Sequence, residues 1–242
     1  MESLSKFRTN ITKLMNFCTN FHNFLKPFNS CWTVFLFLKM RLIFLTLLLC
    51  LNSSVFGQMD TLQVRFLYGS KPRPEHKKEQ KIWFGGMLGG HVGIRYNDTS
   101  YLSFFYEGRV HIFQHKKSKN GKYDFQSVDE FNHIMDEDVD SVKTLVIYIP
   151  ISHDKRLKFD SICASYIKQT PYDYAFFGYR CGSSTYEILA QLGIVKEYSF
   201  FKTWRKIFYP KIVRRKLMHQ AREHQWRYEK HKGTHKRRWE NE

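Results

Sequence analysis

Apolar and polar positions alternate through several short stretches after residue 58. In the stretch HVGIRY, which begins at His91, every second residue is apolar, a period of two that is typical of a half-buried strand. Strands of the same kind are expected at residues 62–68, 101–106 and 109–115. The long β-branched run at residues 142–149 is the strongest strand signal, and Pro150 is expected to end it.

Helical signals separate these strands. Ser127 with Glu130 three residues later is a capping-box pattern, which predicts a short helix to residue 135. Ser152 is expected to cap a helix that runs to about residue 169. Pro210 is placed to open a helix over residues 211–223, and the chain from about Arg227 is expected to be disordered.

Residues 178–194, GYRCGSSTYEILAQLGI, predict a helix that begins with Cys181. Buried positions follow at helical spacing, and Gly193 is expected to end the helix in the left-handed conformation. A helix N-terminus carries partial positive charge, which favours a thiolate. Gly182 is expected to leave room for a substrate to approach the backbone amides. Cys181 is therefore a candidate nucleophile, and the alternative is a small buried residue.

The N-terminal residues predict targeting sequence. From Met40, a positive residue, an apolar run of about ten residues and a small-residue cleavage site ending at Gly57 follow one another, as in a secretory signal peptide. We expect residues 40–57 to be this signal and residues 1–39 to be an upstream extension. The alternative is a membrane anchor with residues 1–39 kept as a cytoplasmic segment. Cleavage near Gln58 would place the mature protein in the periplasm or outside the cell.

The chain is strongly basic, with 242 residues and a net charge of +17. Residues 202–242 contain fourteen Lys/Arg and four Glu, and residues 201–242 are expected to form a basic C-terminal extension. Such charge favours an anionic polymer or membrane surface as a partner. A nucleic-acid partner is disfavoured by the secretory signal. Cysteine spacing matches no zinc pattern, and no metal or organic cofactor is expected.

A cysteine nucleophile needs a base, and His91 is the best candidate because it begins a strand straight after a glycine-rich turn. Only Cys163 and Cys181 remain after cleavage at Gly57. A disulfide between them would end the catalytic proposal. Cys163 is instead expected on the packed face of its helix.

The order of HVGIRY, a following strand with a polar residue, and YRCGSSTYEIL resembles the circularly permuted NlpC/P60 branch of papain-like cysteine hydrolases. That branch includes YiiX-like bacterial proteins and, more distantly, the lecithin:retinol acyltransferase family. The resemblance covers residues 58–200 and implies an α+β, permuted papain-like fold, in which an antiparallel sheet packs against the helix that bears the cysteine. It also implies that Cys181 is the nucleophile and His91 the general base.

The third catalytic position of the family, which orients the histidine ring, falls at Ser103. Family members more often have His, Glu or Gln there, so Glu107 and His111 are alternatives. The aromatic residues 172–177 are expected to line the substrate pocket.

The resemblance implies a cell-envelope thiol hydrolase that cleaves an amide or ester bond in a peptidoglycan peptide or a lipid through an acyl-enzyme. The alternative is a non-catalytic member of the fold that binds the envelope or a membrane surface through its positive charge.

Overall fold

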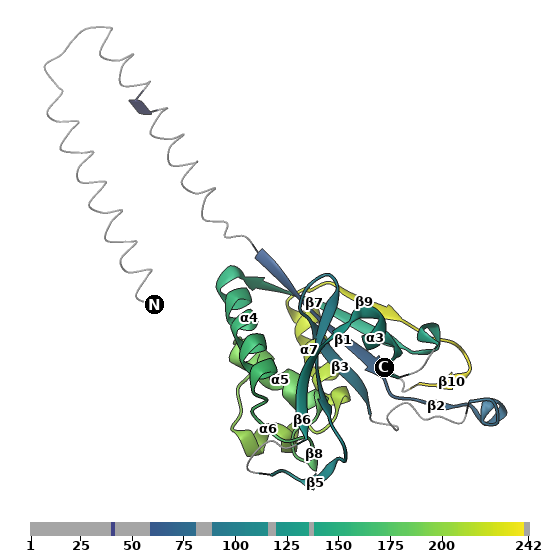
Figure 1. The fold of residues 1–242 in the computed structure, drawn as a ribbon. Helices are drawn as coiled ribbons and strands as arrows, with labels where there is room; N and C mark the ends of the chain where they lie inside the picture. The colour runs from purple at the N-terminus through teal and green to yellow at the C-terminus, as the bar shows by residue number, and fades with distance from the viewer. Residues whose placement is uncertain (1–39, 42–58, 81–88, 116–119, 136–137, 240–242) are drawn as a thin grey trace, which may run out of the picture. The chain divides into compact units, whose positions relative to one another are not determined.

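The structure is a computed structural model that describes residues 40–41, 59–80, 89–115, 120–135 and 138–239 (Figure 1). The chain divides into two units, Met1–Gly57 and Gln58–Glu242. Only Met40 and Arg41 are described in the first unit, and both are helical. The signal segment expected at residues 40–57 otherwise lies outside the described residues, and cleavage after Gly57 stays a prediction.

The second unit is α+β and is built on a six-stranded antiparallel sheet with the order β6-β4-β3-β1-β7-β9. In chain order its strands are β1 (Met59–Tyr68), β3 (Gly90–Arg95), β4 (Ser100–Tyr106), β6 (Gly121–Ser127), β7 (Thr144–Ser152) and β9 (Tyr228–His231). Two small sheets accompany it. One pairs β2 (Lys71–Pro72) with β10 (Arg237–Arg238), and the other pairs β5 (His111–Phe113) in parallel with β8 (Ala175–Phe177).

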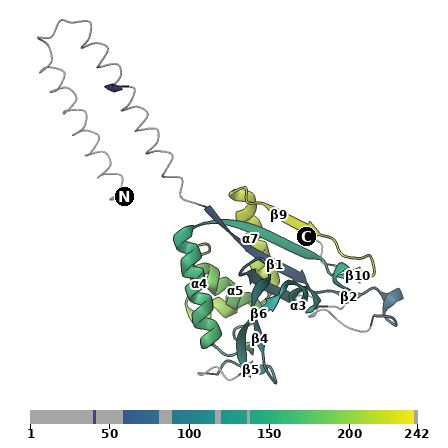
Figure 2. The same ribbon diagram turned by 45° about the horizontal axis from the view of Figure 1, so that its top comes forward.

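Helices cover both faces of the sheet (Figures 1 and 2). The larger core joins one sheet face to α4 (His153–Lys168), α5 (Cys181–Gln191) and α7 (Pro210–Glu223). A smaller core on the opposite face contains Phe131 of α3 (Val128–His133). The short helix α6 (Phe200–Lys206) follows α5, and 3-10 turns occupy Pro74–His76 and Val139–Ser141.

Several local predictions are confirmed because short-range chemistry decides them. The Ser127 hydroxyl accepts from the Glu130 amide while the Glu130 carboxylate accepts from the Ser127 amide, which is the expected capping box. The Ser152 side chain caps α4. Gly193 has a φ of +65° just beyond α5, as a left-handed C-terminal residue should.

Other boundaries were wrong for tertiary reasons. Pro150 does not end β7, which continues to Ser152. Strand β9 pairs with Thr144 to Ile147 only, so on that side no strand pairs with β7 at Pro150, where a proline costs no ladder hydrogen bond. The strand expected at 109–115 shrinks to β5 and leaves the main sheet.

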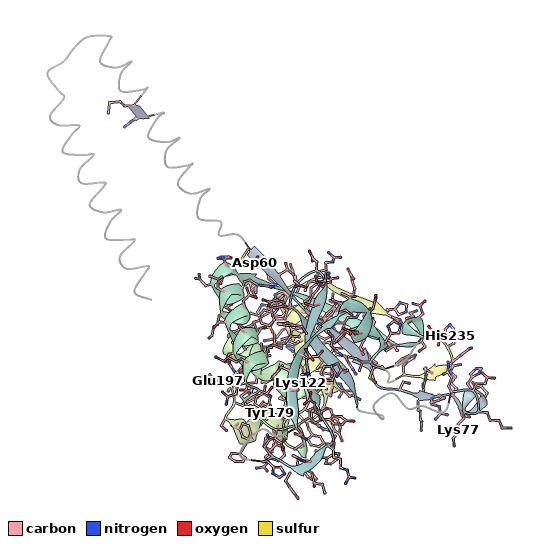
Figure 3. All side chains as sticks on the ribbon, in the orientation of Figure 1. Asp60, Lys77, Lys122, Tyr179, Glu197 and His235 are labelled. Carbon is pink, nitrogen blue, oxygen red and sulfur yellow. The ribbon has the colours of Figure 1, made fainter. Side chains whose placement is uncertain are left out.

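The basic C-terminal segment belongs to the fold. Helix α7 buries Val213 and Leu217 in the larger core, and β9 extends the sheet beyond β7. The expected disorder from Arg227 is therefore wrong over Tyr228–His231. Figure 3 places Lys77 and His235 at one end of this unit, and Tyr179 and Glu197 toward another.

Candidate functional site

Cys181 begins α5 beside the start of β3. Its thiol donates to the carbonyl oxygen of Gly90 at 3.9 Å, and the residue is only 4% exposed. A Cβ on Gly182 would lie 2.9 Å from the nitrogen of Pro210 and 3.1 Å from the carbonyl carbon of Tyr209. The start of α7 therefore fills the space that the sequence assigned to a substrate, and Gly182 serves close packing instead.

The surroundings of the thiol keep it protonated. Burial raises the pKa of Cys181, while the Arg180 guanidinium, two backbone N–H groups and the Tyr174 hydroxyl oppose that rise without cancelling it. Burial likewise raises the pKa of Cys163 to about 12. Both cysteines are free thiols, so the alternative of a disulfide between them is not formed.

His91 and Ser103 are brought together on β3 and β4. The His91 Nε2 lies 3.3 Å from the Ser103 hydroxyl oxygen, and the two residues are 6% and 1% exposed. The imidazole stacks on Phe105, with ring centroids 5.0 Å apart, and tilts against Phe131 at 5.6 Å. Burial lowers the pKa of His91 to about 3, which keeps the ring neutral at physiological pH.

The imidazole and the thiol lie on opposite faces of the sheet. Successive side chains of a strand alternate between faces, and Val92 belongs to the same core as Cys181. Leu67, the cross-strand partner of His91, belongs to the other core with Phe131. No hydrogen bond joins His91 to Cys181, although the structure describes both residues. The three predicted catalytic residues are thus one hydrogen-bonded pair and a separate thiol.

The two alternatives for the third position have other partners. The Glu107 carboxylate pairs with the Lys122 ammonium at 3.2 Å. The His111 Nδ1 lies 2.6 Å from an Asp173 carboxylate oxygen. Sequence reasoning missed Asp173, because nothing in an isolated aspartate of the segment YDYAFF signals that it is buried.

An exposed apolar surface occupies the small β5–β8 sheet. Ile112, Phe113, Phe176 and Phe177 are 66%, 68%, 45% and 41% exposed, and we call these four residues the aromatic ridge. The rings of Phe113 and Phe177 stack with centroids 5.5 Å apart, and Phe176 meets Phe177 at 4.9 Å. Phe176 also contacts Phe208, which follows α6. The segment expected to line a pocket, residues 172–177, thus contributes two phenylalanines to an exposed surface.

Positive charge lies directly beside the aromatic ridge. The Arg180 guanidinium lies 3.8 Å from the centre of the Phe208 ring and 5.3 Å from that of Phe176. Residues 196–216, which include α6 and the start of α7, contain eight Lys/Arg and one Glu. Apolar rings and cations therefore share one part of the surface.

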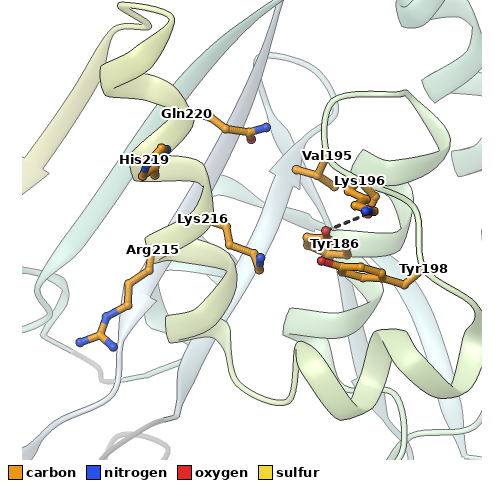
Figure 4. A pocket seen from close by; sticks show the side chains of 8 residues that line it. All are labelled: Tyr186, Val195, Lys196, Tyr198, Arg215, Lys216, His219 and Gln220. Carbon is orange, nitrogen blue, oxygen red and sulfur yellow. Dashed lines mark hydrogen bonds between the residues drawn. The ribbon is translucent and has the colours of Figure 1, made fainter.

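A basic cleft lies between the segment that follows α5 and helix α7 (Figure 4). Its volume is about 480 Å³, and its lining residues are Tyr186, Val195, Lys196, Tyr198, Arg215, Lys216, His219 and Gln220. The rings of Tyr186 and Tyr198 stack with centroids 5.8 Å apart. The ammonium groups of Lys202 and Lys206 lie 5.7 and 5.2 Å from the centre of the Tyr198 ring. This charge suits an anionic group.

Comparison with known proteins gives no relative. No family model matches the chain, and neither the curated proteins nor the solved structures include a significant match. Within the described ranges, none of the helices combines the length and apolarity that crossing a bilayer requires.

Proposed function

We propose that this protein binds an anionic membrane surface, with the aromatic ridge inserted among the lipid headgroups and the neighbouring cations held against phosphate. The observation that carries the proposal is the exposure of four large apolar side chains on the two short strands β5 and β8. Ring contacts join Phe113 to Phe177 and Phe177 to Phe176, and contiguous exposed apolar surface is uncommon on soluble domains unless it contacts a partner. Cations alone would suit any polyanion, whereas protruding phenylalanines suit an interface with an apolar interior.

The charges and the ridge act on the same equilibrium. A Lys or Arg near an anionic leaflet contributes about 1 kcal/mol of attraction, and residues 196–216 carry seven besides the buried Arg214. Complete burial of a phenylalanine side chain contributes about 1.5–3 kcal/mol. The exposed fractions of Phe113 and Phe177, 68% and 41%, leave a large share of that gain available on binding. The ridge should therefore add affinity that salt does not remove.

Vesicle sedimentation tests this proposal. The mature chain, residues 58–242, is mixed with vesicles of phosphatidylcholine alone or with added phosphatidylglycerol. We expect binding to the anionic vesicles and at least tenfold weaker binding by the double variant Phe113→Ser/Phe177→Ser. Leu157→Ser is the matched control, because Leu157 on α4 is 54% exposed and lies outside the ridge.

Equal binding by the double variant and wild type would contradict insertion of the ridge. No binding to anionic vesicles would contradict membrane binding, and so would binding to purified peptidoglycan with none to vesicles. The last result would identify an anionic polymer as the partner. Circular dichroism of each variant confirms that the fold is retained.

For the finer fold, we propose a permuted papain-like arrangement. What supports it is the order of elements: β3 with His91, then β4 with Ser103, and last α5 with Cys181 packed on β3 and β4. An experimental structure that placed α5 away from β3 would reject this assignment.

A second candidate function is the thiol hydrolase, acting on a peptide amide or a lipid acyl bond. The position of Cys181 at the N-terminus of α5, beside the residue that precedes His91, favours it. This function requires His91 to reach the thiol from the other face of the sheet. Cleavage of fluorogenic peptide or lipid ester substrates by wild type, with loss in Cys181→Ser, is its test. Equal turnover by the two proteins would exclude it.

Either function fits a secreted or periplasmic protein, which we propose from the predicted signal segment. Mass spectrometry of the protein from its native cells should find an N-terminus near Gln58. A retained N-terminal segment in the membrane fraction would favour the anchor, and an intact N-terminus in the cytosolic fraction would reject secretion.

A further inference from the structure

Three metal-binding side chains meet at one edge of the β5–β8 sheet. His111 is on β5, His115 follows two residues beyond that strand, and Asp173 precedes β8. The candidate ligand atoms of these three residues all lie within 4.8 Å of one another. The His111 Nδ1 is 2.6 Å from Asp173 Oδ2, and the rings of His111 and His115 have centroids 4.2 Å apart.

The carboxylate of Asp173 supplies an independent observation. Asp173 is 0% exposed, and its Oδ2 accepts from the His111 ring and from the His115 backbone amide at 3.2 Å. Its Oδ1 is buried and has no hydrogen-bond partner within the part of the chain that the structure describes. A buried carboxylate oxygen without a partner is costly, so this atom needs a proton donor or a cation.

The backbone around Asp173 is held before any ligand arrives. The Asp173 carbonyl accepts from the Gln114 side chain at 2.9 Å. The next residue, Tyr174, donates its amide to Asn120 Oδ1 and accepts from Asn120 Nδ2, both at 2.9 Å. These bonds hold the backbone from which the carboxylate projects, whereas His115 is exposed.

We infer that His111, His115 and Asp173 form a binding site for Zn²⁺ or a similar divalent transition metal. Two imidazoles and one carboxylate are preferred zinc donors, and three protein ligands leave one position for water or another ligand. Bonds of about 2.0–2.2 Å place tetrahedral ligand atoms about 3.4 Å apart. Separations of up to 4.8 Å must therefore shorten, whereas the 2.6 Å between His111 Nδ1 and Asp173 Oδ2 must lengthen if both atoms bind the metal. Rotation of the His115 ring shortens the first, and binding through the unpaired Asp173 Oδ1 avoids the second. Hard cations such as Mg²⁺ and Ca²⁺ prefer oxygen ligands and should bind weakly.

This site does not depend on membrane binding or on the thiol. A plain His111–Asp173 hydrogen bond is the competing explanation. It accounts for Oδ2 and leaves Oδ1 unexplained. It also gives the His115 ring no role, so the two explanations differ in what removal of that ring should do.

Calorimetry with ZnCl₂ tests the inference on residues 58–242 after chelator treatment and desalting. We expect one equivalent of Zn²⁺ to bind and to raise the unfolding temperature. His111→Ala and His115→Ala should each weaken binding at least tenfold. His231→Ala is the matched control for adventitious binding at the surface, because His231 is exposed on β9. Visible absorption of bound Co²⁺ should report tetrahedral coordination in wild type and change in both variants.

The inference fails if no Zn²⁺ binds, or if His115→Ala binds it as wild type does. His115→Ala decides the matter even if His111→Ala fails to fold, because the exposed ring can be removed while its backbone hydrogen bond to Asp173 remains. Equal loss of binding in His231→Ala would also overturn it, since the metal would then be held by scattered surface histidines.

Discussion

Replacing His91 with glutamine should remove a large part of the acid sensitivity of this fold. In the folded protein, burial lowers the pKa of His91 from its ordinary value of 6.5 to about 3. Between pH 6.5 and about pH 3, His91 binds a proton in the unfolded chain but not in the folded chain. Unfolding is therefore favoured as pH falls through 6.5, and the loss of stability is complete near pH 3. Glutamine can keep a hydrogen bond to Ser103 and takes up no proton.

The magnitude follows from the two pKa values. One pH unit between them corresponds to 1.36 kcal/mol, and pH 4.5 lies two units below 6.5. Wild-type His91 should therefore cost about 2.7 kcal/mol of stability at pH 4.5 relative to pH 7 or above. The side chain is 6% exposed, so solvent screens little of this effect.

Urea unfolding at a series of pH values between 7 and 4.5 measures the difference. The quantity to compare is the change in unfolding free energy between the two pH limits, which cancels any packing defect of the variant. We expect this change to be about 2–3 kcal/mol smaller in His91→Gln than in wild type. His219→Gln, with a side chain 82% exposed, should leave it unaltered. Equal pH dependence in wild type and His91→Gln would refute the buried, neutral assignment.

Three further predictions concern the thiols, the sheet and the first capped helix. Iodoacetamide at pH 6 should label Cys181 and Cys163 equally slowly in the folded protein, because both are buried thiols of raised pKa; rapid labelling of Cys181 alone would support the hydrolase. Gly93→Ala should lower the unfolding free energy by about 1–3 kcal/mol, because the alanine Cβ would lie 2.6 Å from a ring carbon of Phe131 on α3. Unchanged stability in urea would contradict this packing. Ser127→Ala should lower the unfolding free energy by about 1 kcal/mol through loss of the capping box. Ser199 is an N-cap without a side-chain hydrogen bond, so Ser199→Ala should leave the unfolding free energy almost unchanged. Equal losses in the two variants would reject the capping argument.

The features that sequence could predict are those set by neighbours in the chain. The capping box at Ser127 and the helix that begins at Cys181 depend on residues within a few positions, and both are present. Strand alternation also correctly separated His91 and Gly93 from Val92 and Ile94. Local pattern therefore predicted these two features and the two faces of β3.

Sequence could not say which helix covers which face. His91 belongs with a catalytic thiol only if α5 packs on its side of the sheet, and α3 packs there instead. That choice depends on contacts between residues far apart in the chain. The metal-binding cluster was missed for the same reason, since Asp173 is 62 residues from His111.

The tail was predicted only in part. The helix expected over residues 211–223 is present, but its packing was not foreseen: apolar residues such as Leu217 are spaced on one face of α7 and are buried. Charge on one side of a helix is compatible with packing on the other.

The most direct test of membrane binding is a fluorescent reporter on the aromatic ridge. An environment-sensitive dye is attached through Ile112→Cys, at a position 66% exposed. The control dye is attached through Lys77→Cys, at an exposed position beside the 3-10 turn Pro74–His76, which lies at a different corner of the fold from β5 (Figures 1 and 3). Addition of anionic vesicles should shift the emission of the dye at position 112 to shorter wavelength and leave that of the dye at position 77 unchanged. No shift at position 112, or equal shifts at both positions, would contradict insertion of the ridge into the membrane surface.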